Sequence, residues 1–244
     1  MEWRSEGLII RTRPHGEGNA IVDIFTREQG RYVGLVRGGN SRKQRPILQS
    51  GNMVSALWRA RLSEQLGVLT AENLHAYSAE VLDNNILLTA MQSMCALLQM
   101  TPERHAYARL YDAVQVLLSS LSNLSADDDG AFWLPLYVRF EMMLLEEIGF
   151  GLDMEACAVS GVKEGLTHIS PRSGRAVCAE VAAPYGDKLL PLPSFLLLDN
   201  AAVSKGDVLA GLALTGYFLE RRCYTPNQLT LPPIRARLIN ILKK

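Results

Sequence analysis

The stretch MVSALWRARL, from Met53 to Leu62, alternates between two sets of side chains. One set is apolar and consists of Val54, Ala56, Trp58, Ala60 and Leu62. The other is more polar and consists of Met53, Ser55, Leu57, Arg59 and Arg61. A period of two residues is typical of a β-strand that turns one face toward a core. We therefore predict a strand over residues 52–62.

Four neighbouring segments also have the composition of strands. They are rich in Ile, Val, Leu, Tyr and Trp, and Gly, Asn, Ser and Pro residues separate them. We predict strands at residues 3–13, 19–26, 31–37 and 65–74. Tight turns are expected at Gly16 to Gly18 and at Gln29-Gly30. Five short strands in this order favour a small closed barrel of the OB type, with an SH3-like barrel as the main alternative.

The period becomes helical from about residue 78 onward. Apolar residues recur at helical spacing through residues 79–100, and Pro102 is placed to begin a second helix that runs to about Leu121. A third helix is predicted from Ala131 to Ile148, with the acidic triplet Asp127 to Asp129 as its N-cap and dipole partner. These helices indicate a compact bundle.

The rest of the chain combines a loop-rich insertion with two more helices. Residues 152–195 hold many glycines and prolines and predict short strands at best, whereas 205–224 and 233–242 read as helices that pack back on the bundle. The predicted fold class is α+β multidomain. Its domains are an OB-fold DNA-binding domain (1–77), a helical bundle (78–151), a degenerate zinc-ribbon-like insertion lacking a full ligand set (152–195) and C-terminal helices (196–244).

Charge is distributed very unevenly in this chain of 244 residues, whose formal net charge is zero. Residues 1–61 contain eleven Lys and Arg against five Asp and Glu, a net charge of +6, whereas residues 62–220 contain eight against twenty, a net charge of −12. Within the basic part, GRYVGLVRGGNSRKQRP, from Gly30 to Pro46, carries no acid. Such segregation indicates a polyanionic partner for the N-terminal module.

The sequence lacks the motifs of several enzyme classes. RGGNSRK, from Arg37 to Lys43, does not have the spacing of a phosphate-binding P-loop, and the four histidines share no motif with a nucleophile or a base. We therefore expect no catalytic residues and no cofactor. There is no apolar run of the roughly 18 residues that a membrane helix needs, so we expect a cytoplasmic protein without membrane contact.

A structural zinc site was considered in the insertion. Cys157 and Cys178 have the separation expected of two ligand pairs, but Ser160 and Val181 occupy the positions of the second cysteines. His168 offers a third ligand at most. We predict no bound metal and interpret the two cysteines as structural thiols, leaving open whether they and His168 retain residual metal affinity.

Several segments together resemble the RecO family of bacterial recombination mediators. They are GLIIRTRPHGEGNAIVDIFTREQGRYVGLVRGGNSRK near the N-terminus, YVRFEMMLLEEIGFGLDMEACAVSG in the helical part and SPRSGRAVC in the insertion. The resemblance covers nearly the whole chain in the right order. Some members hold a zinc ribbon in the insertion, and only Cys157 and Cys178 match it here.

The resemblance implies a DNA-binding mediator that is not an enzyme. Such proteins bind single- and double-stranded DNA, anneal complementary strands and, with RecR, help RecA load on DNA coated by single-stranded DNA-binding protein, so association with the nucleoid is expected. The basic segment would be the DNA face of the barrel. Its candidate phosphate-binding residues are Arg11, Arg13, Arg31, Arg37, Arg42, Lys43 and Arg45.

Other expected contacts are less specific. Tyr32 and Trp58 offer stacking surfaces if they point outward, although Trp58 shares the apolar face of its strand. Arg139 is the candidate that binds the acidic C-terminal tail of single-stranded DNA-binding protein, with Arg221 and Arg222 as weaker ones; the alternative for Arg139 is an ion pair with an acid such as Asp112.

Two questions stay open on the sequence. The sequence does not decide whether Arg27, Arg59 and Arg61 contact DNA or belong to an ordinary solvated strand face. The alternative function for the whole chain is a protein-interaction adaptor that docks an acidic partner, with DNA binding incidental.

Overall fold

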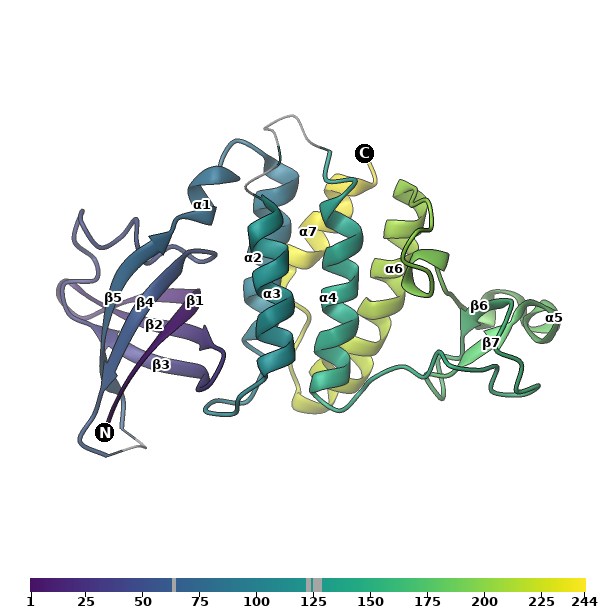
Figure 1. Cartoon of the computed structure of the whole chain (residues 1–244), viewed down its shortest axis with the longest axis horizontal. Coiled ribbons are helices and arrows are strands. Elements are labelled where there is room, and N and C mark those ends of the chain that lie inside the picture. The colour runs from purple at the N-terminus through teal and green to yellow at the C-terminus, as the bar shows by residue number, and fades with distance from the viewer. Residues whose placement is uncertain (63–64, 122–123, 125–128) are drawn as a thin grey trace. The chain divides into compact units, whose positions relative to one another are not determined.

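The computed structural model describes residues 1–62, 65–121, 124 and 129–244. The chain divides into two compact units, Met1–Asp128 and Asp129–Lys244 (Figure 1). The first unit contains the N-terminal barrel together with helices from the predicted bundle, and the second contains the remaining helices and the insertion. Among the residues described, no helix is long and apolar enough to cross a membrane.

Five strands form a closed barrel in the first unit, which confirms the predicted OB-type architecture. They are β1 (Glu2–His15), β2 (Asn19–Thr26), β3 (Gly30–Val36), β4 (Met53–Arg59) and β5 (Gly67–His75). Their order around the barrel is β1-β2-β3-β5-β4, and β4 closes it by pairing with β1. Neighbouring strands are antiparallel except β3 and β5, which pair in parallel at Gly34↔Gly67 and Leu35↔Val68.

The alternation in β4 supplies much of the barrel core. Val54, Ala56 and Trp58 are all buried, and the Trp58 indole N–H donates to the carbonyl of Val33 at 3.2 Å. Gly67 lets β5 approach this ring, because a Cβ atom there would lie 2.2 Å from a Trp58 ring carbon. The predicted strand was too long at its end: β4 stops at Arg59, and Leu62 is exposed.

The first predicted helix is broken. It divides into α1 (Tyr77–Glu80) and α2 (Asn85–Leu98), because the Asn84 side chain accepts hydrogen bonds from the N–H groups of Ile86 and Leu87 and so begins α2 anew. Helix α2 packs against β1, where the Cys95 thiol lies 3.9 Å from the carbonyl oxygen of Ile9.

The second predicted helix begins later than the sequence suggested. Helix α3 spans Ala108–Leu121, so the prediction that Pro102 begins it was wrong. The intervening residues pair with the barrel instead: the Arg104 N–H donates to the carbonyl of Arg31, and Glu103 forms a parallel bridge with Arg31. Gly30 has φ of +67°, and a Cβ atom there would lie 1.8 Å from the carbonyl oxygen of His105.

The second unit is built around three longer helices, α4 (Trp133–Glu147), α6 (Lys205–Phe218) and α7 (Pro233–Leu242). The chain continues from α6 through a π-helical turn at Leu219–Tyr224. Asp127 and Asp128 of the predicted N-cap lie outside the described residues. Asp129 accepts a hydrogen bond from the N–H of Ala131, but α4 begins later and its N-cap, Phe132, makes no side-chain cap.

The insertion forms a small three-stranded sheet in the order β7-β6-β8. Its strands are β6 (Leu166–Ile169), β7 (Ala176–Cys178) and β8 (Leu190–Pro191), and β7 leads directly into the short helix α5 (Ala179–Ala182). Short 3-10 turns occur at Ala183–Lys188, Ser194–Leu196 and Thr225–Asn227. The predicted short strands are therefore present.

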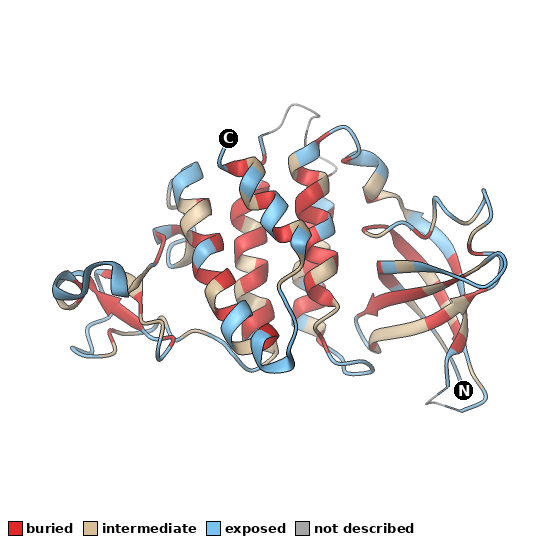
Figure 2. Ribbon diagram, turned by 180° about the vertical axis from the view of Figure 1, so that it is seen from behind, coloured by how far each residue is buried: buried red, intermediate tan, exposed pale blue. Residues whose placement is uncertain are grey.

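A buried ion pair lies among the helices of the second unit, whose buried residues are drawn in red in Figure 2. The Arg235 guanidinium of α7 donates to both carboxylate oxygens of Glu141 on α4, at 2.7 and 2.8 Å. It also donates to the carbonyl of Leu212 on α6 at 2.6 Å, and the Thr215 hydroxyl donates to Glu141. Although burial opposes the charged form, the attraction of Glu141 raises the pKa of Arg235. The pair therefore links three helices.

Candidate nucleic-acid interface

The segment between β3 and β4, residues 37–52, is a folded loop held against the barrel. The Asn40 N–H donates to the carbonyl of Gly18 at 3.0 Å, and the Thr12 hydroxyl of β1 donates to the carbonyl of Leu48 at 2.6 Å. Leu48 itself is buried in the barrel core. These contacts fix the backbone of the loop at both ends, so its charged side chains project from a defined support.

Three cations project from this loop, and we call Arg42, Lys43 and Arg45 the loop cations. All three are exposed. Among the residues that the structure describes, they form no ion pair. Exposed cations that no protein acid neutralises are available to neutralise DNA phosphates.

Arg37 stands apart from the loop cations, at the start of the same loop. It lines a groove of about 710 Å³ with Arg59 and Arg61, beside the first residues of β1 and β5. We call this the arginine groove. Arg59 is engaged there by Glu2, with N–O distances of 2.7 and 3.2 Å, and that hydrogen bond raises the pKa of Arg59.

The sequence left Arg59 and Arg61 open between a DNA contact and an ordinary solvated strand face, and they were not in the predicted set of phosphate-binding residues. The alternation within residues 52–62 places Arg59 and Arg61 on the outer side of the strand, and this was the sequence pattern that could indicate their exposure. Their proximity to Arg37 depends on the parallel pairing of β3 with β5, a long-range contact that no local pattern reveals.

The remaining predicted cations surround one buried carboxylate. Asp23 is 3% exposed, and its oxygens lie 3.7 Å from an Arg13 nitrogen and 3.5 Å from an Arg31 nitrogen. Burial raises the pKa of Asp23, while Arg31, Arg13 and Arg11 act against this rise. Arg11 and Arg13 are exposed, and Arg11 also donates to the Gln99 side chain at 3.3 Å.

Arg31 differs from every other cation of the predicted set. Its side chain is only 17% exposed, and its Nε donates to the carbonyl of Thr101 at 2.8 Å. A second acid, Glu103, lies 3.4 Å from the same guanidinium. Arg31 thus holds the 101–105 segment on the barrel, and its charge is already matched by Asp23 and Glu103.

Tyr32 and Trp58, the two predicted stacking residues, do not form an open stacking platform. Trp58 is 1% exposed and belongs to the barrel core. Tyr32 is half-buried; its ring meets the edges of Trp58 and Trp3 at centroid distances of 5.1 Å, and the Arg104 guanidinium lies 5.3 Å over it. Trp58 therefore cannot stack on a base in this structure.

Arg27 has a partner within the first unit. It donates to both carboxylate oxygens of Asp112 at 2.8 and 3.0 Å, a hydrogen bond that raises the pKa of Arg27 and lowers that of Asp112. Asp112 therefore pairs with Arg27, and not with Arg139 as the alternative from the sequence suggested.

The three cations proposed to bind the partner tail have separate surroundings in the second unit. Arg139 donates to Asp199 at 2.8 Å and to the carbonyl of Phe195 at 2.6 Å, and the Asp199 side chain is 88% exposed. Arg221 lies over the ring of Tyr217, and Arg222 lies 4.6 Å over the ring of Phe218. Arg139 therefore already pairs with an acid that solvent can reach.

The insertion does not present the ligands of a zinc ribbon. Ser160 lies where a third thiolate would be needed, and its hydroxyl is 3.5 Å from the Cys178 sulfur. The His168 ring nitrogen Nδ1 pairs with the Thr167 hydroxyl at 2.9 Å. Within the described ranges, no three His, Cys, Asp or Glu side chains cluster closely enough to hold a metal ion. Two thiols and a hydroxyl do not fit the four-ligand site of such a ribbon.

Comparison with known proteins gives the same family for both parts of the chain. Family models for the N-terminal and C-terminal parts of recombination protein O match residues 1–77 and 84–228. The DNA repair protein RecO of Mesorhizobium japonicum is 44% identical over 250 residues, covering 100% of this chain and 94% of that protein. That of Dinoroseobacter shibae is 44% identical, with 100% and 99% covered, and that of Brucella abortus strain 2308 is 42% identical, with 98% and 95% covered. The chain belongs to the RecO family of DNA repair proteins.

Proposed function

We propose that this protein binds single- and double-stranded DNA along a path from the arginine groove to the loop cations. The observation that carries the proposal is the set of exposed cations on one folded loop, Arg37, Arg42, Lys43 and Arg45, without an ion-pair partner in the described structure. Each cation that neutralises a phosphate releases condensed counterions, which provides affinity without sequence preference.

The other predicted cations contribute less to this surface. Arg31 is a positioning residue, because its charge is matched by two acids and its donor groups hold the 101–105 segment. Arg11 and Arg13 are exposed and remain candidates at the edge of the path. Arg61, which the sequence left open, joins Arg37 as a candidate, since both line the arginine groove.

Binding of this kind supports a mediator rather than a bond-making enzyme. A surface that holds phosphates without reading bases allows two complementary strands to be brought together and annealed. We propose that the protein anneals strands and, with RecR, assists the loading of RecA where single-stranded DNA-binding protein covers the DNA. The family membership supports a role in DNA repair and recombination.

Strand annealing is the direct test of this function. The triple variant Arg37→Ala, Arg42→Ala, Lys43→Ala should anneal complementary oligonucleotides far more slowly than the wild type, with and without single-stranded DNA-binding protein. Arg27→Ala is the matched control, because it removes a barrel arginine that Asp112 already pairs with. If the folded triple variant anneals like the wild type, the proposed DNA path is wrong. Loss of partner binding with intact annealing would favour the adaptor function.

We further propose that Arg139 receives the acidic C-terminal tail of single-stranded DNA-binding protein. A carboxylate from the tail would take the position of Asp199 on the guanidinium, and the exposed Leu198 side chain next to it supplies apolar surface. Arg221 and Arg222 are weaker candidates, because aromatic rings already hold them.

The displacement of Asp199 gives this second proposal a specific test. Asp199→Asn should strengthen binding of a tail peptide, since it removes the competing charge, whereas Arg139→Ala should weaken it by roughly 1.5 to 3 kcal/mol. Fluorescence anisotropy with a labelled peptide measures both variants, and Arg175→Ala, which removes the partner of Asp153 elsewhere in the unit, is the control. Equal weakening in both variants would mean that the pair only holds the 195–199 segment in place.

A further inference from the structure

Two cysteines are brought together in the insertion by a short loop. The Cys157 N–H donates to the carbonyl of Val162 at 2.7 Å, which closes the loop on itself. The next N–H, of Ala158, donates to the carbonyl of Ala176 at 2.8 Å and so fastens the loop to β7. Because Cys178 is the last residue of β7, the two thiols come from neighbouring, hydrogen-bonded segments.

Ser160 connects the two sulfurs. Its hydroxyl is 3.5 Å from the Cys178 sulfur and also hydrogen-bonds to Cys157. This hydrogen bond, followed by those from the backbone N–H groups of Ser160 and Cys178, lowers the pKa of Cys157 to about 6. The lowered pKa favours the thiolate of Cys157, and a thiolate is the form of cysteine that reacts.

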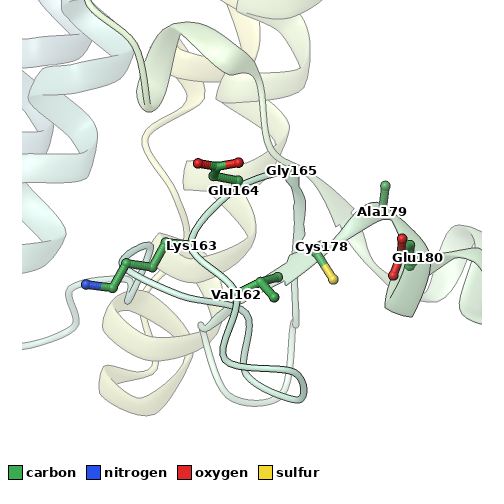
Figure 3. A pocket seen from close by; sticks show the side chains of 7 residues that line it. All are labelled: Val162, Lys163, Glu164, Gly165, Cys178, Ala179 and Glu180. Atoms are coloured by element: carbon green, nitrogen blue, oxygen red, sulfur yellow. The ribbon is translucent and has the colours of Figure 1, made fainter.

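A hollow gives small molecules access to one member of this pair, Cys178. It has a volume of about 670 Å³ and is lined by Val162, Lys163, Glu164, Gly165, Cys178, Ala179 and Glu180 (Figure 3). Cys157 and Cys178 are themselves 1% and 6% exposed. A molecule as small as a peroxide can enter such a hollow and reach the Cys178 sulfur in its wall, whereas a folded protein cannot. Cys157 is next to that position, because the Ser160 hydroxyl hydrogen-bonds to both sulfurs.

The other two cysteines differ from Cys157 in that burial is the main influence on their pKa. Cys95 and Cys223 are buried, and burial raises the pKa of Cys95 to about 12 and that of Cys223 to about 11. Neither lines the hollow beside Cys178. They serve as internal references for unreactive thiols in the same chain.

We propose that Cys157 and Cys178 form a peroxide-sensitive thiol pair that closes to a disulfide. The Cys157 thiolate attacks one oxygen of hydrogen peroxide, the O–O bond breaks, and Cys157 sulfenic acid and hydroxide form. The Cys178 sulfur then attacks the Cys157 sulfur, the S–O bond breaks, and its oxygen leaves as water once the proton of the Cys178 thiol is transferred. The hydroxide takes up the proton that Cys157 released when it ionised, so in total two thiols are oxidised to one disulfide and one peroxide is reduced to two waters.

Differential alkylation of the full chain tests the proposal. The reduced protein is treated with hydrogen peroxide, its free thiols are blocked with N-ethylmaleimide, and each cysteine is quantified by peptide mass spectrometry before and after reduction. We expect Cys157 and Cys178 to lose their label together and Cys95 and Cys223 to remain labelled. The intact mass, measured before alkylation, should fall by two hydrogens.

Variants identify the order of the steps. Cys178→Ser should leave Cys157 as a sulfenic acid that dimedone traps, and Cys157→Ser should leave Cys178 unmodified. Cys223→Ser is the control and should preserve the disulfide. Independent loss of the two labels, stable sulfenic acid on Cys157 in the wild type, or faster oxidation of Cys95 or Cys223 would each overturn the proposal. The wild-type measurement decides the matter even if a variant does not fold.

Discussion

Removal of Arg235 should destabilise the second unit severely, while the first unit remains unchanged. The side chains of Arg235 and Glu141 are 4% and 0% exposed, so solvent cannot replace a lost partner. Arg235→Met retains apolar bulk but removes both guanidinium hydrogen bonds to the buried Glu141 carboxylate. Of the side-chain donors described above, only the Thr215 hydroxyl would then remain for Glu141. Breaking one side of a buried pair typically costs about 3–5 kcal/mol of unfolding free energy.

This cost is large compared with the roughly 5–15 kcal/mol that stabilises a typical domain. Replacing both partners, Glu141→Met with Arg235→Met, removes the uncompensated charge, and we expect the double variant to be more stable than the single one. The free energy of unfolding of the double variant should lie within about 2 kcal/mol of the wild type.

Native-state hydrogen exchange measures each unit separately. The slowest amides of α6 in Arg235→Met should exchange roughly 10²- to 4 × 10³-fold faster than in the wild type, since each 1.4 kcal/mol is a factor of ten. Amides of α2, in the first unit, should be unaffected. A change below about 1 kcal/mol in α6, or a double variant less stable than the single one, would refute the reasoning.

Two further variants test the barrel. Gly30→Ala should destabilise the first unit by at least about 2 kcal/mol, because its Cβ would lie 1.8 Å from the carbonyl oxygen of His105 at φ of +67°. Gly16→Ala is the matched control, because Gly16 has φ of +54° and a Cβ atom there would meet no atom within 4 Å. It should lower the free energy of unfolding measured with urea by about 1 kcal/mol. Equal destabilisation by the two substitutions would contradict the steric argument. Burial raises the pKa of Asp23 above its usual 3.8, so the folded state binds the proton of this carboxyl group more tightly than the unfolded state does. The resulting stabilisation is full at a pH below the pKa of the unfolded state. It declines as the pH rises through the pKa of the folded state. In Asp23→Asn, the free energy of unfolding measured with urea between about pH 3 and 7 should lack that decline. A difference in unfolding free energy between variant and wild type that is constant with pH would contradict this prediction.

The barrel was predictable because its strands are local patterns. Alternation around Trp58 identified β4, and turn residues such as Gly30 marked where strands begin. The main error there was at the end of β4, where the apolar character of Leu62 continued the pattern after the pairing had ended. Composition reports which face a residue prefers, whereas the length of a strand depends on its partner strand.

The helix boundaries were less predictable because tertiary contacts determine them. Residues 79–100 have one apolar period, but the Asn84 side chain caps the backbone within it. Pro102 is acceptable at the start of a helix, yet the following residues pair with Arg31 of β3. Neither the cap nor the pairing is visible in periodicity alone, since both depend on where the barrel places the chain.

The candidate site was predictable as a charge pattern but not as a surface. The sequence predicted Arg37, the loop cations and Arg31 as one set, and the structure separates Arg31 from the others because two acids surround its guanidinium. Arg61 joins Arg37 only through the pairing of β3 with β5. Charge counts therefore indicated the partner class, while the grouping of individual arginines required the fold.

The most direct test of the DNA path is the salt dependence of single-stranded DNA binding, measured for the wild type, the triple variant Arg37→Ala, Arg42→Ala, Lys43→Ala and the control Arg27→Ala. Each phosphate contact contributes about 0.7 to the slope of the logarithm of affinity against the logarithm of salt concentration. If all three side chains contact phosphates, the slope should fall by about 2 in the triple variant and remain unchanged in the control. An unchanged slope in the folded triple variant, or an equal loss in Arg27→Ala, would contradict the proposed interface.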